Sequence, residues 1–413
     1  MSAAAPPACV LRGHTGSVQC LAFDPAAPAH LASASDNELL VTDCALPSSP
    51  APLFCATNAE LGLAHPVQAL CWGRKGALYL GSGAHVLRVA VPGSAAGAWA
   101  GPPPLPEVLA TCSDDVSALA VHATAPLLAA CDDEGCVTLI HLDAAAGAAV
   151  LRRPGHASLA TGVAFCAAPP GCAGLVSAGC DQRLLVWDAP GGGAGEARAL
   201  PLLAESLPDL LLLQALEGGA QGEEGLGMGV NPPHILALAL GPPPPQPSAP
   251  ALLAAALGDG AVLACALSWQ RGGRGGGGAL RPSLAVPWVE RSSLSPACAL
   301  ATVPLGGGSS GGAEGAPPPP ARSLLVSASN SACLRAWDWA ALGAAPGPPA
   351  PLAAWAHSGA GEGARRRKIN WMAGSPCAGG LLAVADTGRR ITLYLLAGLG
   401  EGAPGPPAGA PRQ

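Results

Sequence analysis

Lysine is almost absent from this sequence, and charge of either sign is scarce. Lys75 and Lys368 are its two lysines, charged residues make up 12% of the 413 positions, and the formal net charge is −6. Binding of nucleic acid requires a basic patch or stripe, which this composition does not provide. We therefore expect no nucleic-acid partner.

Long apolar runs and processing signals are also missing. No run of 18 uncharged apolar residues occurs, so we expect no membrane-spanning helix. Residues 1–7 have neither the basic region nor the apolar core of a secretory signal. There is no Gly-X-Y period, which excludes a collagen-like chain. These absences predict an intracellular protein, cytoplasmic or nuclear, with no membrane partner.

The 15 cysteines do not follow the spacing of metal or redox sites. The closest pairs are Cys131 with Cys136 and Cys166 with Cys172, and no C-x-x-C occurs. Structural zinc sites and thioredoxin-like sites use that closer spacing. The glycine-rich stretch 272–278 is not followed by the Lys-Ser/Thr of a phosphate-binding loop. We expect mostly buried, reduced thiols, no metal and no cofactor.

Glycine and proline, in contrast, are abundant. The chain holds 56 Gly and 45 Pro, together 101 of 413 residues, or about 24%. This share is close to that of low-complexity chains. However, 50% of the residues are hydrophobic and the mean hydropathy is +0.36, so the chain does not meet the criterion of low hydropathy and high charge for disorder. The composition predicts a folded chain with many turns and loops.

A block of alternating apolar residues recurs seven times. The clearest copy runs from Gly155 and His156 through 162–165 and 175–179 to 184–188. The blocks end near residues 43, 89, 143, 188, 267, 338 and 395, so the first three gaps are 46, 54 and 45 residues. A propeller blade of four strands occupies ~40–45 residues. Short runs with period 2, such as 137–142 and 391–395, indicate strands. The repeats predict an all-β, seven-bladed β-propeller.

The later gaps are longer because segments rich in glycine and proline interrupt the repeats. Such segments cannot extend a strand ladder, so we interpret them as loop inserts. The predicted inserts are 190–229, 241–250, 270–287, 306–320 and 343–363. The predicted propeller is one domain, 8–397, with blades at approximately 13–46, 64–92, 109–145, 155–189, 231–269, 293–341 and 368–397. Residues 1–7 and 398–413 are predicted to be disordered.

Two dipeptides in these blocks resemble degenerate WD repeats. Gly-His occurs at Gly13-His14 and Gly155-His156, and Trp-Asp at Trp187-Asp188 and Trp337-Asp338. The segments 114–119, 127–135, 162–165, 175–177, 368–371 and 384–386 extend the resemblance to one member of the WD-repeat family, over roughly residues 8–397. The resemblance implies that strand 8–12 is the outer strand of the last blade, where it pairs near 391–395 and closes the ring.

The resemblance also implies a function. That family member is associated with cullin-4 RING ubiquitin ligases, as a candidate substrate receptor that docks on the ligase's three-propeller adaptor. Such receptors often carry a Trp-Asp-x-Arg motif. Here Trp187-Asp188 is followed by Ala189-Pro190, and Trp337-Asp338 by Trp339-Ala340, so the arginine is missing from both. The expected partners are proteins, namely the adaptor and a substrate.

His156, Ser177, Asp181 and Trp187 match the structural tetrad of a WD blade. The resemblance implies that the histidine bonds the aspartate and that the serine and tryptophan extend the network. A His/Ser/Asp set also occurs in hydrolase triads, but the sequence has no Gly-x-Ser-x-Gly elbow between a strand and a helix. We therefore favour the structural role. Other blades have lost members, since Thr42 and Leu142 stand where the tryptophan would.

Two further segments have alternative interpretations. Arg365, Arg366, Arg367 and Lys368 form the one basic cluster, which is either a site for nuclear import or an acidic partner, or a solvated loop before the last blade. Residues 201–216 are compatible with a short amphipathic helix, which either binds a partner or packs on the propeller.

The sequence thus predicts a non-catalytic scaffold for protein interactions, acting as a substrate receptor of a cullin-4 RING ubiquitin ligase. The alternative is a generic WD-repeat hub in another intracellular complex, for example one associated with chromatin. A chromatin reader would need an acidic or aromatic pocket at a mouth of the central channel. An enzyme would need titratable residues that converge in a pocket, which the sequence does not indicate.

Overall fold

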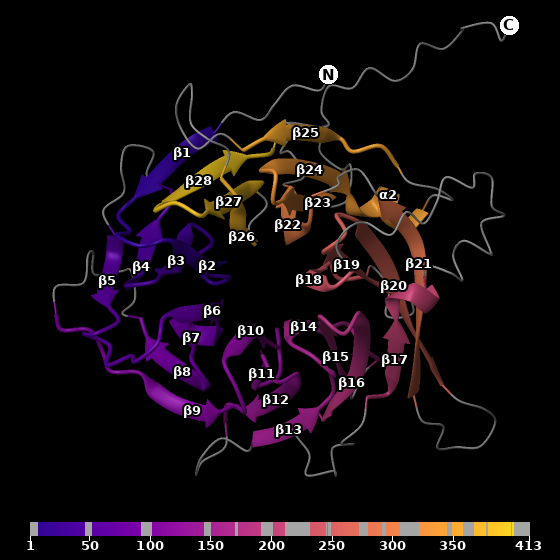
Figure 1. Cartoon of the computed structure of the whole chain (residues 1–413), viewed down its shortest axis with the longest axis horizontal. Coiled ribbons are helices and arrows are strands. Elements are labelled where there is room, and N and C mark those ends of the chain that lie inside the picture. The colour runs from indigo at the N-terminus through magenta and orange to yellow at the C-terminus, as the bar shows by residue number, and fades with distance from the viewer. Residues whose placement is uncertain are drawn as a thin grey trace, which may run out of the picture.

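Seven four-stranded sheets surround a central channel like the blades of a propeller (Figure 1). The structure is a computed structural model. It describes residues 7–45, 52–91, 101–143, 150–169, 172–190, 201–210, 232–244, 246, 249–271, 280–290, 295–305, 322–344, 349–357, 367–376, 379–397 and 399. The predicted seven-bladed propeller is confirmed.

Within each of the first six blades, consecutive strands pair in chain order from the channel outward. Blade one contains β2 (Val18–Phe23), β3 (His30–Ser35), β4 (Glu38–Asp43) and β5 (Pro52–Thr57). Blade two contains β6 (Val67–Trp72), β7 (Ala77–Ser82), β8 (His85–Ala90) and β9 (Glu107–Thr111). Blade three contains β10 (Val116–Val121), β11 (Leu127–Asp132), β12 (Cys136–His141) and β13 (Val150–Pro154).

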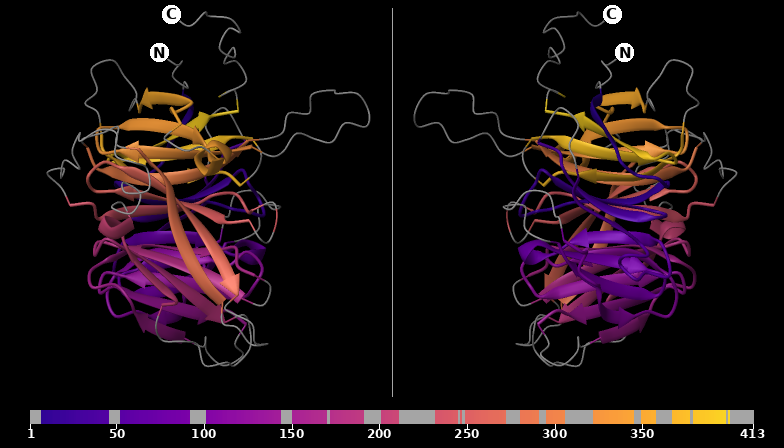
Figure 2. Two further views of the ribbon diagram at one scale, coloured as in Figure 1. Left: turned by 90° about the vertical axis from the view of Figure 1, so that its right-hand side faces the viewer. Right: turned by 90° about the vertical axis from the view of Figure 1, so that its left-hand side faces the viewer.

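The next three blades repeat this order. Blade four contains β14 (Ala160–Cys166), β15 (Cys172–Gly179), β16 (Arg183–Pro190) and β17 (Leu203–Ser206). Blade five contains β18 (Ile235–Leu240), β19 (Ala251–Leu257), β20 (Val262–Arg271) and β21 (Leu280–Glu290). Blade six contains β22 (Ala297–Leu305), β23 (Arg322–Ser329), β24 (Cys333–Asp338) and β25 (Ala353–Ala356). The long strands β20 and β21 cross the rim of the ring diagonally (Figure 2).

Blade seven is built from both ends of the described chain. It contains β26 (Ile369–Gly374), β27 (Leu381–Asp386) and β28 (Arg390–Leu395), and its outer strand is β1 (Pro7–Arg12). β1 runs antiparallel to β28, with Leu11 opposite Ile391. The predicted closure of the ring by the N-terminal strand is confirmed.

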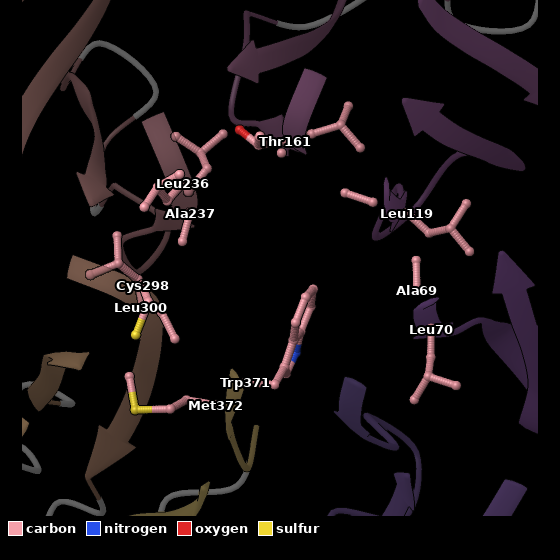
Figure 3. A pocket seen from close by; sticks show the side chains of 15 residues that line it. Ala69, Leu70, Leu119, Thr161, Leu236, Ala237, Cys298, Leu300, Trp371 and Met372 are labelled. Atoms are coloured by element: carbon pink, nitrogen blue, oxygen red, sulfur yellow. The ribbon is translucent and has the colours of Figure 1, made fainter. Parts of the chain in front are cut away.

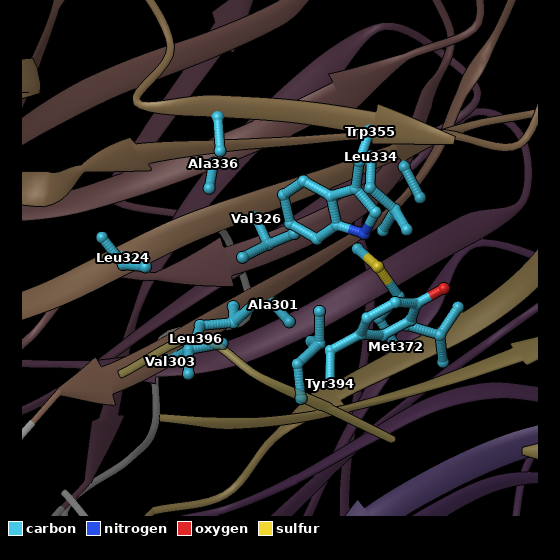
Figure 4. Packing of buried hydrophobic residues seen from close by; sticks show 14 of the residues in the cluster. Ala301, Val303, Leu324, Val326, Leu334, Ala336, Trp355, Met372, Tyr394 and Leu396 are labelled. Atoms are coloured by element: carbon cyan, nitrogen blue, oxygen red, sulfur yellow. The ribbon is translucent and has the colours of Figure 1, made fainter. Parts of the chain in front are cut away.

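Apolar side chains fill the spaces between neighbouring blades. All six residues of the middle strand β11 are buried, because a middle strand is covered on both sides. Between blades six and seven, Val326 and Trp355 pack with Met372 and Tyr394 in one buried cluster (Figure 4). Burial of this kind contributes about 25 cal/mol per Å² of apolar surface, so each blade depends on its neighbours for stability.

Three of the predicted inserts contain the outer strand of a blade, and their interpretation as loops is wrong at those positions. β17 lies within 190–229, most of β21 within 270–287, and β25 within 343–363. An outer strand pairs on one side only, so it tolerates proline; β21 contains Pro282 and Pro287. Residues 306–320 lie outside the described part of the chain, and the described residues of 241–250 form neither strand nor helix.

The predicted blade boundaries are shifted against the observed ones by about one strand. Each expected block begins near a Gly-His or an inner strand and ends at or close to the end of the third strand, so it omits the outer strand of its own blade. Thus β5 (Pro52–Thr57) follows the expected first blade, 13–46, and the expected block 109–145 begins inside β9 (Glu107–Thr111). The predicted disorder at 1–7 and 398–413 falls outside the described residues except at Pro7, which begins β1, and Leu399.

Helix is confined to short pieces in the described part of the chain. A 3-10 turn covers η1 (Arg74–Gly76), and α2 (Trp339–Ala344) follows β24. The amphipathic helix predicted for 201–216 is wrong at its start, because 203–206 is strand β17 and the helical conformation begins at Leu207. Leu207 and Leu210 are buried in the cluster between blades four and five, and 211–216 lie outside the described residues.

Leu11 tests the contribution of the closing strand to stability. Leu11 is buried in β1, whereas Leu395 on the partner strand β28 is 55% exposed. We expect Leu11→Ala to lower the free energy of unfolding by about 2–3 kcal/mol, because it leaves a cavity in the closing blade. Leu395→Ala is the matched control and should change it by less than about 0.5 kcal/mol. If both variants unfolded at the same urea concentration, the result would contradict a contribution of the closing strand β1 to stability.

Candidate functional site

Blade four holds a buried chain of hydrogen bonds that ends at a carboxylate. Trp187 Nε1 donates to Ser177 Oγ at 2.9 Å, and Ser177 Oγ lies 2.9 Å from His156 Nε2. On the other side of the ring, His156 Nδ1 lies 2.9 Å from Asp181 Oδ1. Since the Asp181 carboxylate can only accept, His156 donates from Nδ1. The neutral ring then accepts at Nε2 from the Ser177 hydroxyl, which in turn accepts from the Trp187 indole. The four residues of the predicted tetrad are therefore brought together.

This network joins two blades. His156 follows β13, the outer strand of blade three, whereas Ser177 and Trp187 lie on β15 and β16 of blade four. Gly155 must be glycine, because a Cβ there would lie 2.6 Å from the Trp187 ring. The set cannot work as a hydrolase triad in this form, since Ser177 is fully buried and its hydroxyl is held between Trp187 and His156.

Burial lowers the pKa of His156 below its ordinary value, although the hydrogen bond and charge of Asp181 oppose the shift. The same desolvation lowers the pKa of His14 against the effect of Glu38. Both rings are therefore neutral at pH 7. A neutral imidazole can accept at Nε2 while it donates from Nδ1, which is what the hydrogen-bond chain of blade four requires.

Sequence reasoning missed a second network, in blade one. His14 Nε2 lies 2.8 Å from Ser33 Oγ, and His14 Nδ1 lies 3.2 Å from Glu38 Oε1. Glu38 also accepts from the hydroxyl of Thr15 at 2.7 Å. Burial alone would raise the pKa of Glu38, but these hydrogen bonds and the nearby His14 outweigh it and lower the pKa. The Gly13-His14 dipeptide was the available sequence signal. Its acidic partner does not match the motif, because Glu38 is a glutamate and the turn before it is one residue shorter than the corresponding turn of blade four.

A third network lies in blade seven. His357 Nδ1 lies 2.9 Å from the Tyr394 hydroxyl, and His357 Nε2 lies 3.3 Å from Asp386 Oδ2. The acid lies near Nε2 of His357, whereas it lies near Nδ1 of His14 and His156, so the imidazole has the opposite orientation. Tyr394 occupies the position that Trp187 has in blade four. Burial would raise the pKa of Asp386, but the hydrogen bonds from His357 and Gly388 lower it. His357 follows β25 without a preceding glycine, so no motif marked it.

The two Trp-Asp pairs each have a guanidinium nearby that comes from another strand. The guanidinium carbon of Arg153 lies 5.8 Å from the centroid of the Trp187 ring, and Arg153 Nη1 donates to the Asp188 carbonyl oxygen at 3.1 Å. Arg153 is fully buried. In blade six, Arg322 Nε donates to Asp338 Oδ2 at 2.6 Å, with 33% of the arginine side chain exposed. The rings of Trp337 and Trp288 pack edge-on, with 5.3 Å between their centroids.

The predicted basic cluster is only partly described. Arg365 and Arg366 lie outside the described residues. Arg367 Nη1 lies 3.9 Å from Asp386 Oδ1, with 53% of its side chain exposed, and Lys368 is exposed beside the channel.

Every inner strand carries a β-bulge at its second residue. The pairing register with the next strand shifts there in all seven blades. We call the seven bulged residues the bulge ring: Gln19, Gln68, Ser117, Thr161, Leu236, Cys298 and Asn370. Bulges redirect a side chain locally. Here they place one side chain per blade at the same end of the inner strands.

Four side chains of the bulge ring donate to the backbone of the following blade. Thr161 Oγ1 donates to the Ile235 carbonyl at 2.6 Å, and Asn370 Nδ2 to the Val18 carbonyl at 3.1 Å. Cys298 Sγ lies 3.2 Å from the Ile369 carbonyl oxygen, and Ser117 Oγ donates to the Ala160 carbonyl. Each acceptor is the first residue of the next inner strand. The bulge ring thus links neighbouring blades around the channel.

The bulge ring opens onto a pocket of about 400 Å³ at the mouth of the channel. Its lining combines amides, one cation and one indole: Gln19, Gln68, Leu236, Cys298, Lys368, Ile369, Asn370 and Trp371. None of these described lining residues is acidic. Deeper in, a cavity of about 240 Å³ is lined mainly by Ala, Leu and Val, and the Trp371 indole projects into the opening (Figure 3). We call the polar pocket the channel mouth.

Among the described residues, no cysteine whose side chain is placed forms a disulfide, and burial raises the pKa of Cys298 to about 11, which makes it a poor nucleophile. Within the same residues, no group of three His, Cys, Asp or Glu side chains is placed to hold a metal ion, and no helix is long and apolar enough to cross a membrane.

Comparisons with known proteins agree with the architecture. The family model "WD domain, G-beta repeat" matches residues 6–43, which span β1 to β4. The matched repeat thus contains the outer strand of one blade and the first three strands of the next. Together with the propeller fold, this match supports the WD-repeat family. The comparison with curated proteins found no match.

A chain of the solved structure "Crystal Structure of Mitotic Checkpoint Complex" has the same fold. It is 14% identical, with a TM-score of 0.58, over 95% of this chain and 92% of that chain. In all, 1273 chains of solved structures match. A fold shared so widely does not select a function, which must be sought in the surfaces of this chain.

The neutral buried histidines predict a dependence of stability on pH. The unfolded histidines bind protons below about pH 6.5, while His14 and His156 in the folded state do so only at lower pH. Stability should therefore fall as the pH drops from 7 to 5, by at most about 1.4 kcal/mol per pH unit and histidine. Urea unfolding at pH 7, 6 and 5 measures this.

His156→Asn tests whether the buried, neutral His156 causes part of this pH dependence. The variant should be less stable than the wild type at pH 7 but lose less stability between pH 7 and 5. His85→Asn replaces an exposed histidine and should keep the wild-type slope. Parallel slopes for all three proteins would contradict a neutral His156.

Trp187 and Trp337 form a matched pair for measuring the hydrogen bond in the tetrad. Both indoles are buried, but Trp187 Nε1 donates to Ser177, whereas Trp337 Nε1 has no hydrogen-bond partner. Trp187→Phe should lower the free energy of unfolding by about 1 kcal/mol more than Trp337→Phe, since it alone removes a hydrogen bond. Thermal and urea unfolding check the difference, and an equal loss would show that the bond adds nothing to stability.

Proposed function

We propose that this protein is a non-catalytic scaffold that holds one protein at the channel mouth and docks on another at the rim. The observation that carries the proposal is the difference between the polar side chains buried in the three networks and those exposed at the channel mouth. The buried histidines and acids bond one another, whereas Lys368 and Gln68 are exposed at a 400 Å³ opening.

The chemistry of the channel mouth favours an extended acidic segment. Its amide side chains can bond the backbone of such a segment, Lys368 supplies a positive charge, and Trp371 supplies an apolar surface. The same lining argues against a reader of basic chromatin tails. Such a reader needs an acidic or aromatic pocket, and of these the described lining offers the single indole of Trp371, with the like charge of Lys368 beside it.

We further propose that the docking partner is the adaptor of a cullin-4 RING ubiquitin ligase. The resemblance of 114–119, 127–135 and 368–371 to WD repeat-containing protein 53 supports this role as a substrate receptor, in the cytoplasm or nucleus. The Trp-Asp-x-Arg arginine is missing, but Arg322 places a partly exposed guanidinium on Asp338. Arg153 is fully buried, so Arg322 is the better candidate to replace the missing arginine. The ligase would supply the chemistry, and the scaffold would raise the effective concentration of the target.

Affinity purification from cells with quantitative mass spectrometry tests both surfaces. We expect Arg322→Ala to lose the adaptor and cullin-4 while it keeps other partners. Lys368→Glu should keep the ligase proteins and lose partners held at the channel mouth. Arg88→Ala is the matched control, because Arg88 forms an exposed ion pair with Glu107.

The possible outcomes separate the two parts of the proposal. If the wild type recovers no cullin-4 adaptor where a known receptor does, the ligase role is wrong and the generic hub remains. If Lys368→Glu recovers the same proteins as Arg88→Ala, the channel mouth does not hold a partner.

A further inference from the structure

An exposed proline segment precedes the outer strand of blade two. Residues 101–106 read Gly-Pro-Pro-Pro-Leu-Pro and lead directly into β9, with neither helix nor strand of their own. Proline fixes φ near −65°, and a residue before proline is confined to extended conformations. Gly101, Pro102, Pro103 and Leu105 all precede a proline. These restrictions favour the polyproline II conformation for the segment, independently of what packs on it.

Leu105 in this segment is 76% exposed, the largest exposure among the large hydrophobic residues that the structure describes. Val108, at the start of β9, is 58% exposed. Polyproline II has three residues per turn, so Pro102 and Leu105 share one edge, and this edge is the solvent-exposed one. Pro103 and Pro106 share a second edge and are half-buried. An apolar side chain is thus presented to solvent by a stiff backbone.

We propose that residues 102–106 are a docking site for a WW-type domain, whose groove of aromatic rings binds polyproline II ligands. Grooves of this class take proline and leucine side chains from a preformed, low-entropy ligand. Little ordering entropy is lost on binding, because the segment is already restricted before the partner arrives.

The charges around the segment favour this class over an SH3 domain with an acidic pocket for a basic ligand residue. Residues 101–106 carry no charge, and the next residue is Glu107, which is paired with Arg88. The segment therefore offers no cation of its own to an acidic pocket. The site lies on the outer edge of blade two, on different residues from the channel mouth and from Arg322, so it does not rest on the proposed function.

The test uses the full chain and an isolated, ¹⁵N-labelled WW domain that binds a synthetic Pro-Pro-Leu-Pro peptide. We expect addition of the chain to broaden and shift the signals of the groove aromatics. Leu105→Ala and Pro102→Ala should each weaken binding by about tenfold or more, since each removes an apolar side chain of the exposed edge from the groove. Both should unfold at the wild-type temperature. Leu159→Ala, at another exposed leucine, is the matched control and should bind like the wild type.

Three results would overturn the proposal. The first is that the WW domain does not respond to the wild-type chain. The second is that Leu105→Ala binds as tightly as Leu159→Ala, which would locate binding at another proline-rich segment. The third is that a labelled SH3 domain responds through residues 102–106 and the WW domain does not.

Discussion

The pairing of β1 with β28 is the interaction on which the rest of the structure depends. Blades one to six are each built from strands that are close in sequence, so they form locally. Blade seven alone takes its strands from both ends of the described chain, over a separation of almost 400 residues. Closing so long a loop costs entropy, although that cost grows slowly with length. Each blade buries its faces against its neighbours, and an open ring would expose the faces of blades seven and one.

The buried histidine networks are concentrated beside this seam. His14 follows β1 and bonds Ser33 and Glu38 of blade one, while His357 follows β25 and bonds Asp386 and Tyr394 of blade seven. Two of the three networks therefore lie on either side of the blade that closes the ring. On the channel side, Asn370 of blade seven donates to the Val18 carbonyl of blade one. The closing blade is therefore held by directional side-chain contacts on both of its sides.

The sequence allowed the inner parts of the blades to be predicted and concealed the outer parts, for a physical reason. Inner and middle strands are covered on both sides, so apolar residues are required there, as in β11, and the pattern is visible. An outer strand is covered on one side and paired on one edge. It therefore tolerates Pro282 and Pro287 in β21, and its composition cannot be told from that of a loop. The site followed the same rule. His156, Ser177, Asp181 and Trp187 were found by their motif, but His357 was not, because no glycine precedes it and a tyrosine stands where blade four has its tryptophan.

The side chains available for binding are those that the buried hydrogen-bond networks do not use. Buried polar side chains hold turns and blades together in this propeller, and 1273 chains of solved structures share the fold. In this molecule the three buried histidines and their acidic partners are used in this way. Lys368 and Leu105 are instead exposed, and Arg322 stays partly exposed although it bonds Asp338. Lys368 at the channel mouth, Arg322 at the rim of blade six and Leu105 beside blade two lie on three separate blades and differ in chemistry. Surfaces so unlike one another suit different partners, and a ring that keeps the blades in fixed positions would hold those partners at fixed distances.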